Sequence, residues 1–289
     1  MSASVRPAHH EERLDVATFL HERMNSKISV ERWGELIDGR WAAEDAGYAI
    51  LALDDDGAIQ GVLAAIYADR EINGHAARTC NLSSWYITKE FRGGGLGFKM
   101  MSTALSEPGV TFTTYSSNPP ALSVCFKAGM VPLETHRLIW HARSTSAPGS
   151  VEISTDVKTV ETDLDAPSLK ALSDHQDLNI HPVVFRDDRK TGLAVFSIKE
   201  KGADIAYHEA LYISERETFA KHARALADAL LPKTQALMSV DKRLMDGLSV
   251  SPDEAEPLPV QRGFQSAGLK ASEMDFLYSE IPLLDLKLY

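Results

Sequence analysis

The first part of the chain alternates between helical and strand-like spacing of its apolar side chains. In residues 11–24 apolar positions recur at intervals close to one helical turn, and Ser29 is a suitable N-cap for a second helix at residues 29–41, which predicts two helices after a short strand at residues 5–7. Strand-like runs follow at residues 48–53 and 58–67, and the Asp-Gly pair between them is typical of a hairpin turn. This order predicts two helices followed by a β-hairpin.

Further strands and helices are predicted around a glycine-rich loop. Residues 80–88 contain consecutive β-favouring side chains and predict a strand, directly before the loop Arg92-Gly93-Gly94-Gly95-Leu96-Gly97. Apolar residues after the loop share one helical face, and residues 107–109 (Glu-Pro-Gly) end that helix. The remaining predicted elements are a strand at residues 110–115, a helix from residue 118 to 127 ended by a glycine at 129, and a last strand at residues 133–141.

A segment of small and turn-forming residues divides the chain. Residues 144–150 read Ser-Thr-Ser-Ala-Pro-Gly-Ser, a composition typical of linkers. The length of 289 residues suits two domains. We therefore expect a first domain at residues 1–143, a linker at residues 144–150 and a second domain at residues 151–289.

Two short patterns recur between the halves. Residues 85–90 resemble residues 211–216 in residue type at most positions, and Ala128-Gly129-Met130 resembles residues 267–269, Ala-Gly-Leu. An insertion within residues 251–259 would account for the different offsets. The patterns indicate a duplicated fold, with chance similarity as the alternative. Residues 218–223 stand where the glycine loop stands in the first half, and their side chains would keep an anion away from the backbone.

Charge and cysteine content narrow the functional classes. The net charge is −11 at pH 7, with most of the surplus acid in the second half, which argues against nucleic acid or a polybasic membrane patch as partner. Cys80 and Cys125 form no disulfide framework. No run of 18 apolar residues, no apolar leader and no ligand set around His9-His10 is visible, so we expect a cytoplasmic protein without a structural metal.

The glycine loop has the chemistry of an anion site. A helix N-terminus leaves backbone N–H groups without partners and carries partial positive charge. Glycines allow a positive φ and keep Cβ atoms out of the way, so the amides can approach a phosphate, and Arg92 adds a fixed charge. A Rossmann glycine pattern would need glycine at position 98 or 100, where this chain has Phe98 and Met100. A Walker loop would need glycine directly before the lysine, and Phe98 stands there instead.

The spacing that fits is Arg-x-x-Gly-x-Gly, met by Arg92, Gly95 and Gly97. With the following Asn-x-x-Ala-x-x-x-Cys-x-x-x-Gly-Met segment from Asn118 to Met130, it resembles the acyl-CoA loop and second helix of the GNAT (GCN5-related N-acetyltransferase) superfamily. The resemblance covers about residues 5–142. It implies an α/β fold of two GNAT-like domains, each a mostly antiparallel, twisted mixed sheet flanked by helices, the second degenerate and without the phosphate loop.

The same resemblance implies the cofactor contacts. The backbone of Ile87 and Thr88 would pair with the pantetheine arm of acetyl-CoA or another acyl-CoA, as an added strand does. Asn118 would lie near the thiol end. The pyrophosphate site would comprise Arg92, Gly93, Gly94, Gly95, Leu96, Gly97 and Phe98.

The catalytic residues are less clear from the sequence. Cys125 replaces the tyrosine that serves the family as general acid; a thiol, with a pKa of about 8.5 against about 10 for tyrosine, could protonate a thiolate. A small core residue is the alternative. No carboxylate occurs in residues 80–86, so Ser84 could only orient a water molecule, and Tyr115 and His136 are further candidates that could equally be structural.

These features predict an acyl-CoA-dependent N-acyltransferase acting on a small amine by direct transfer in a ternary complex. The alternatives are a non-catalytic CoA-binding or scaffold protein, and a ligase that uses charged tRNA, against which the acidic balance argues. A homodimer is an open expectation.

Overall fold

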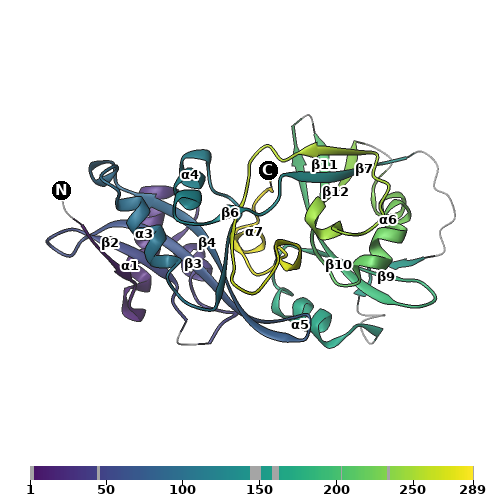
Figure 1. Ribbon diagram of the computed structural model, residues 1–289, viewed down its shortest axis with the longest axis horizontal. Coiled ribbons are helices and arrows are strands. Elements are labelled where there is room, and N and C mark those ends of the chain that lie inside the picture. The colour runs from purple at the N-terminus through teal and green to yellow at the C-terminus, as the bar shows by residue number, and fades with distance from the viewer. Residues whose placement is uncertain are drawn as a thin grey trace. The chain divides into compact units, whose positions relative to one another are not determined.

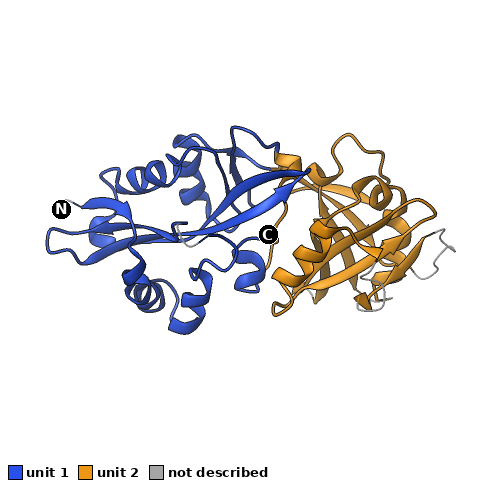
Figure 2. Cartoon of the chain, turned by 90° about the horizontal axis from the view of Figure 1, so that it is seen from below, with its two compact units in different colours: residues 1–133, 260–270, 278–286 blue, residues 134–259, 271–277, 287–289 orange. Residues whose placement is uncertain are grey.

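The computed structural model describes residues 3–43, 46–143, 151–157, 163–202, 204–232 and 235–288. The chain divides into two compact units (Figure 2). Unit 1 comprises residues 1–133, 260–270 and 278–286, and unit 2 comprises residues 134–259, 271–277 and 287–289. This division differs from the expected one, because unit 1 ends at residue 133 and includes two C-terminal segments. The expected linker, residues 144–150, lies outside the described residues.

Unit 1 is built on a mixed, mostly antiparallel sheet of seven strands. Among the described strands of this sheet, β4 and β5 are the pair that runs parallel, from Arg78 beside Val110 to Asn81 beside Thr113. In sheet order the strands are β1 (Ser4–Pro7), β2 (Ala49–Leu53), β3 (Ile59–Ile72), β4 (His75–Ile87), β5 (Val110–Thr114), β14 (Gly263–Gln265) and β6 (Val131–Pro132).

The central hairpin is longer than we predicted. Strands β3 and β4 extend to a turn at Asn73-Gly74, where both residues have positive φ (51° and 77°). An Asn-Gly pair favours this turn because asparagine and glycine tolerate the left-handed conformation. The residues near the turn still pair across the two strands, although they are too polar for the sequence to predict a strand there.

Helices cover both faces of this sheet (Figure 1). The helix pair α3 (Leu96–Ala104) and α4 (Pro119–Lys127) packs on one face, and α1 (Arg13–Phe19) lies on the other. Met100, Met101 and Cys125 from the first pair lie in a core with alternate residues of β2, β3 and β4. The shorter helical elements are η1 (His10–Glu12), the π-helix η2 (Leu20–Met24), α2 (Val30–Leu36), η3 (Lys89–Phe91) and α7 (Glu280–Leu283).

Helix α2 begins as expected and ends early. The Ser29 side chain accepts a hydrogen bond from the Arg32 N–H at 3.3 Å, so it caps the helix. The helix ends at Leu36, and Gly39 has a φ of 79°. A left-handed glycine close to a helix end redirects the chain, so the predicted continuation to residue 41 is wrong.

Unit 2 repeats the same sheet order with other strands. Helix α6 (Arg216–Leu230) packs on this sheet through Phe219, Ala223, Leu226 and Ala227. The strands in sheet order are β8 (Glu152–Ser154), β9 (His181–Arg186), β10 (Thr191–Lys201), β11 (Ile205–Ile213), β12 (Ala236–Asp241), β7 (His136–His141) and β13 (Glu254–Pro257). The other helical elements are α5 (Ala166–Asp174), η6 (Lys242–Met245) and η7 (Ala271–Glu273).

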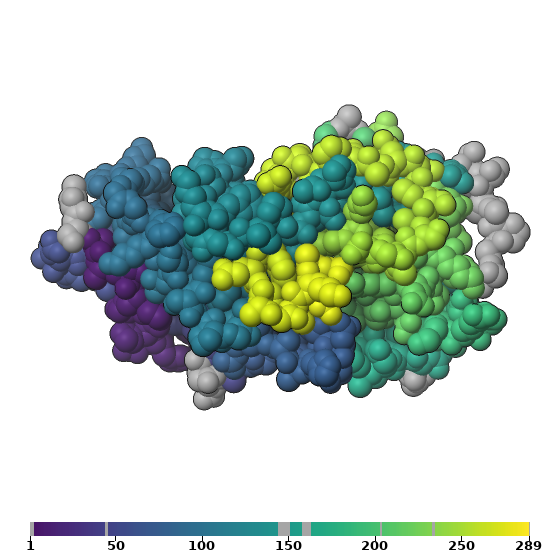
Figure 3. All heavy atoms as spheres, viewed as in Figure 1, coloured from purple at the N-terminus to yellow at the C-terminus, as the bar shows by residue number. Residues whose placement is uncertain are grey.

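One strand of each sheet comes from the other half of the sequence. Strand β7 lies between β12 and β13 of unit 2, whereas β14 lies between β5 and β6 of unit 1. Figure 3 shows the C-terminal residues, in yellow, beside teal residues from the middle of the chain. Within unit 1, β14 pairs with β5. We predicted residues 133–141 as the last strand of the first domain. The strand found there belongs instead to the sheet of unit 2, so its predicted sheet is wrong.

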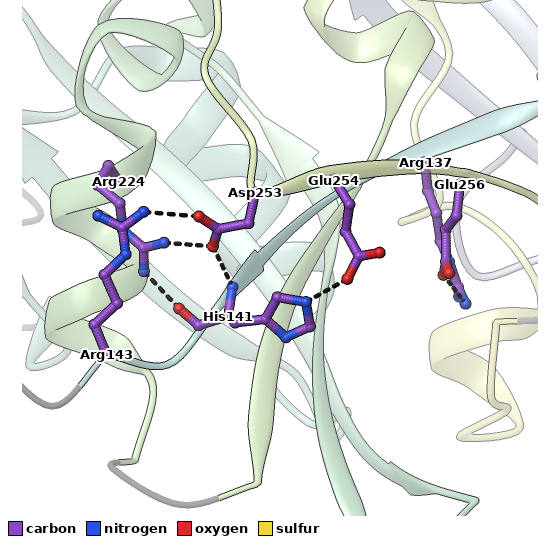
Figure 4. Close-up of polar contacts among 7 residues, drawn as sticks. All are labelled: Arg137, His141, Arg143, Arg224, Asp253, Glu254 and Glu256. Carbon is purple, nitrogen blue, oxygen red and sulfur yellow. Dashed lines mark hydrogen bonds and ion pairs between the residues drawn. The ribbon is translucent and has the colours of Figure 1, made fainter.

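Acidic side chains before and within β13 tie this edge strand to β7 (Figure 4). Asp253 accepts a hydrogen bond from the His141 N–H at 2.8 Å and pairs with Arg143 at 2.7 Å and Arg224 at 2.8 Å. Burial opposes ionisation, but the His141 N–H and the two guanidinium groups hold the pKa of Asp253 below its usual value. Two further pairs join the strands, His141 with Glu254 and Arg137 with Glu256.

The predicted duplication is confirmed, with one correction. Residues 85–90 and 211–216 are equivalent, because each segment contains the end of the strand that pairs in parallel, β4 or β11. The second pairing is wrong, since Ala267-Gly268-Leu269 follows β14 in unit 1. The equivalent of Gly129 (φ 111°), which precedes β6, is Gly247 (φ 74°), which precedes β13.

Candidate functional site

The loop between η3 and α3 presents bare backbone at a helix N-terminus. Gly93, Gly94 and Gly95 have φ angles of 89°, 57° and 81°, a region that favours glycine. A Cβ at any of the three would meet nothing within 4 Å, so the space in front of them is open. Gly95 is the N-cap of α3, and no side chain caps the helix there. The helix end is therefore free to receive an anion.

Gly97 has a different role from the other three glycines. A Cβ at Gly97 would lie 3.0 Å from the ring of Trp85 on β4. Glycine at this position lets the first turn of α3 pack closely on the strand. The four glycines thus combine an open cradle with a tight helix–strand contact.

A groove of about 840 Å³ begins at this loop. Seven of the ten predicted cofactor residues line it: Ile87, Arg92, Gly93, Gly95, Gly97, Phe98 and Asn118. The sequence interpretation missed seven other lining residues: Met24, Trp85, Tyr86, Pro120, Ala121, Val124 and Lys127. Of these, Lys127 could have been suspected, since it lies in the last turn of the helix that follows Asn118.

Two positively charged side chains, Arg92 and Lys127, line the groove. The Arg92 guanidinium stacks on the ring of Tyr86, with 5.2 Å between its Cζ and the ring centroid, and its Nε donates to the Ile87 carbonyl at 2.8 Å. Among the described residues neither Arg92 nor Lys127 forms an ion pair. Two such charges favour a ligand that carries several phosphate charges.

Three predicted cofactor contacts do not face the groove. Thr88 donates its N–H to the Gln60 carbonyl at 2.9 Å and accepts from the Phe91 N–H at 3.1 Å, so its backbone is already paired. The prediction that Thr88 pairs with a ligand is therefore wrong. Leu96 packs against the core, and Gly94 is exposed outside the groove lining.

The groove leads to a gap between β4 and β5. Their pairing ends at Asn81 and Thr113, and beyond it β4 bulges, with Ser84 at a φ of 47°. A cavity of about 80 Å³ lies at the gap and shares Met24, Trp85, Asn118 and Ala121 with the groove. Bulges next to sites redirect the backbone, so this cavity is a suitable closed end for an extended ligand.

The predicted catalytic residues differ in position. Ser84 lines the small cavity, with its hydroxyl 3.2 Å from that of Ser83. This position agrees with the predicted role of Ser84 in orienting a water molecule, which stays a prediction. The Asn118 side chain caps α4 by accepting from the Ala121 N–H at 3.0 Å while the residue lines both spaces. Tyr115 is buried and lines neither, so a direct role for its side chain is not supported.

Cys125 lies in the hydrophobic core. Its exposure is 0%, it lines neither space, and burial raises the pKa of its thiol to about 11. The side chain contributes to the cluster that includes Met100, Phe112 and Met130. A thiol enclosed by apolar groups has no path to a thioester, so we correct the catalytic interpretation of Cys125 to a packing role.

Unit 2 lacks the equivalent of the glycine loop. Helix α6 begins at Arg216, soon after β11 ends at Ile213, and its N-cap is Glu215, whose carboxylate is 3.4 Å from Lys190. Residues 218–220 are buried inside the helix. Unit 2 thus lacks the loop itself and not only its glycines, and the carboxylate of Glu215 lies at the N-terminus of the helix.

Two sheets with this strand order, each with a parallel pair, and the open glycine loop before α3 define the fold of the GCN5-related N-acetyltransferases, present twice in this chain. Among solved structures, a GCN5-related N-acetyltransferase from Anabaena variabilis matches with a TM-score of 0.57 at 12% identity, covering 92% of this chain and 73% of that one. One from Kribbella flavida matches with a TM-score of 0.51 at 11% identity, covering 92% and 72%. Eis1 from Mycobacterium abscessus gives a TM-score of 0.50 at 9% identity, covering 92% and 74%.

No family model and no curated protein matches the sequence. At these identities the structural likeness shows the fold. Of the helices in the described ranges, none combines the length and apolar character needed to cross a bilayer. No group of three or more potential metal ligands occurs in the same ranges.

Proposed function

We propose that this protein is an acyl-CoA-dependent N-acyltransferase that transfers an acetyl group to a small amine. The observation that carries the proposal is the open N-terminus of α3, where three left-handed glycines have no side chain against them, no side chain caps the helix, and Gly93 and Gly95 line the groove. Acyl-CoA has an anionic diphosphate, a further phosphate and a long extended arm. These features suit the helix end, the cations Arg92 and Lys127, and a groove that ends in a narrow gap.

The proposed reaction is direct transfer. With the diphosphate held at the loop, the extended arm would pass Ile87 and bring the thioester to the cavity beside Ser84 and Asn118. The amine nitrogen attacks the carbonyl carbon, the C–N bond forms, the C–S bond breaks and the thiolate of CoA leaves. Positioning of the two reactants accounts for much of such a rate increase. The fold of the neighbours supports this reaction class, and the acceptor amine is left to experiment.

A pair of glycine variants tests the cofactor site. Gly95→Glu places a carboxylate at the helix end, whereas Gly57→Glu serves as matched control, because Gly57 has nearly the same φ (82°) and equally open surroundings but lies in the turn between β2 and β3. We expect calorimetry to show acetyl-CoA binding by the wild type and by Gly57→Glu, with at least about 100-fold weaker binding by Gly95→Glu from lost contacts and added repulsion.

Turnover is then measured as free thiol released in the presence of amino sugars, amino acids and polyamines. Amine-dependent release supports an enzyme. Binding without release from any amine supports the alternative of a CoA-binding scaffold. Equal affinity of Gly95→Glu and wild type would refute the assignment of the loop.

A further inference from the structure

Glu280 places a buried carboxyl group next to the gap between β4 and β5. The residue belongs to the C-terminal segment of unit 1, and its exposure is 0%. Its backbone N–H donates to Oδ1 of Asn81 at 3.2 Å, and Asn81 is the last residue of β4 that pairs with β5. The Asn81 amide also donates to Thr113 at 3.2 Å. This contact fixes Glu280 where the two strands begin to separate.

The carboxyl group lacks the partners that buried carboxylates normally have. Neither oxygen has a hydrogen-bond partner of good geometry among the described residues. Burial raises its pKa to about 7, against the opposing effects of its own backbone N–H, the hydroxyl and N–H of Ser116, and the N–H of Tyr115. The group is therefore poised to change its charge near neutral pH.

The charged side chains near α7 are engaged elsewhere. Arg32 on α2 donates to the Leu283 carbonyl and pairs with Glu35. Arg70 stacks on the ring of Tyr278, with its Cζ 4.2 Å from the centroid. The groups that act most on Glu280 are its own N–H and uncharged groups of the two residues after β5, and α7 itself has no other ionisable side chain.

Ser116 connects this carboxyl group to the proposed site. The residue is exposed and lines the small cavity together with Ser84 and Asn118, whereas Glu280 lines neither space. A hydroxyl group can donate one proton while it accepts another. Ser116 therefore lines the cavity and is also among the groups that act on the buried Glu280 carboxyl group.

We propose that Glu280 takes up the proton of the acceptor amine through the hydroxyl of Ser116. This inference rests on the proposed function and makes Glu280 a positioning residue rather than a direct substrate contact. As the ammonium group loses a proton to the Ser116 oxygen, the hydroxyl passes its own proton to a Glu280 oxygen. The neutral amine then attacks the thioester carbonyl, the C–N bond forms and the C–S bond breaks, and the departing thiolate takes the proton that the nitrogen loses as the amide forms. The proton on Glu280 returns to solvent after product leaves.

The test compares Glu280→Gln, Ser116→Ala and Ser116→Thr with the wild type. Glu71→Gln is the matched control, because Glu71 is an exposed carboxylate on β3. For each protein, kcat/KM for transfer from acetyl-CoA is measured between pH 5.5 and 9 with two amines of different pKa, and acetyl-CoA affinity is measured by calorimetry. If the rate rises at the same pH for both amines, the group that titrates belongs to the enzyme and not to the amine.

We expect the wild type and Glu71→Gln to show this rise near neutral pH. Glu280→Gln should lose it, with kcat about 100-fold lower at pH 8 and acetyl-CoA affinity within about twofold of wild type. Ser116→Ala should lose about tenfold, and Ser116→Thr, which keeps a hydroxyl group, should recover most of the rate.

The outcomes separate the two proposals. A Glu280→Gln variant that keeps the wild-type pH profile overturns the role of Glu280 and leaves the proposed function intact. Equal losses of affinity and of turnover in this variant also overturn it, because they indicate a structural effect. A wild type that transfers to no amine overturns both proposals.

Discussion

Replacing Glu280 with glutamine should make the folded protein more stable at alkaline pH. Burial raises the pKa of this carboxyl from its ordinary value of 4.5 to about 7. The folded state therefore holds a proton that the unfolded state has released between these two pH values, so wild-type stability falls as pH rises through this window. Glutamine has nearly the same shape and does not ionise.

The size of the effect follows from the pKa shift. Each pKa unit corresponds to about 1.4 kcal/mol, so the full shift amounts to about 3 kcal/mol in the free energy of unfolding. The difference between Glu280→Gln and wild type should grow by this amount from pH 4 to pH 8. For a unit of this size it corresponds to a rise in melting temperature of roughly 6–12 °C.

Urea unfolding at pH 4, 5, 6, 7 and 8 measures the difference. Tryptophan fluorescence reports mainly on unit 1, since Trp33, Trp41 and Trp85 belong to it and only Trp140 belongs to unit 2. Glu71→Gln, which removes an exposed carboxylate, should follow the wild type at every pH. If the curves of Glu280→Gln and wild type stay parallel across this range, the carboxyl is not desolvated as the fold indicates, and the reasoning is refuted.

Three further changes test the groove, the core and the edge of the second sheet. Arg92→Gln should weaken acetyl-CoA binding about tenfold in low salt and less in high salt, as calorimetry at two salt concentrations would show. Cys125→Ala should leave kcat within about twofold and lower unfolding free energy by about 1 kcal/mol, because the thiol packs in the core; loss of turnover in a folded variant would contradict this. Asp253→Asn should destabilise unit 2 by about 1–2 kcal/mol at pH 7. Because the pKa of Asp253 is lowered, this difference should begin to shrink as pH falls below 3.8 and be lost as pH falls through the lowered pKa, so urea unfolding should show a smaller difference at pH 3 than at pH 7.

Local signals in the sequence were sufficient for the elements that surround the loop. The glycine loop and the ends of α3 and α4 depend on residues close in sequence, and they occur where the sequence predicts them. The fold class follows from the same elements, since the order around the glycine loop is distinctive.

The sheet assignment of β7 and β14 could not be read from the sequence. A strand pattern shows which face of a strand is apolar, but it does not show which edge the strand pairs with. Both sheets offer the same position, beside β5 or β12, so local hydrophobicity does not distinguish them. The long-range polar contacts of Asp253 with His141, Arg143 and Arg224 are specific to one choice, and they are visible only in the fold.

The same exchange explains why Glu280 was not among the proton acceptors considered from the sequence. The segment that carries Glu280 was expected to belong to the second domain, whereas it returns to unit 1 and reaches Asn81. Strands β4 and β5 supply the gap, and in this chain their residues 80–86 and 110–115 contain no carboxylate. A group that must lie near the thioester can therefore come from the C-terminal segment, because the return of β14 to the first sheet carries the chain past the gap. It follows that removal of residues 260–288 should disrupt both the first sheet and the proposed proton path, even though the glycine loop lies far away in sequence.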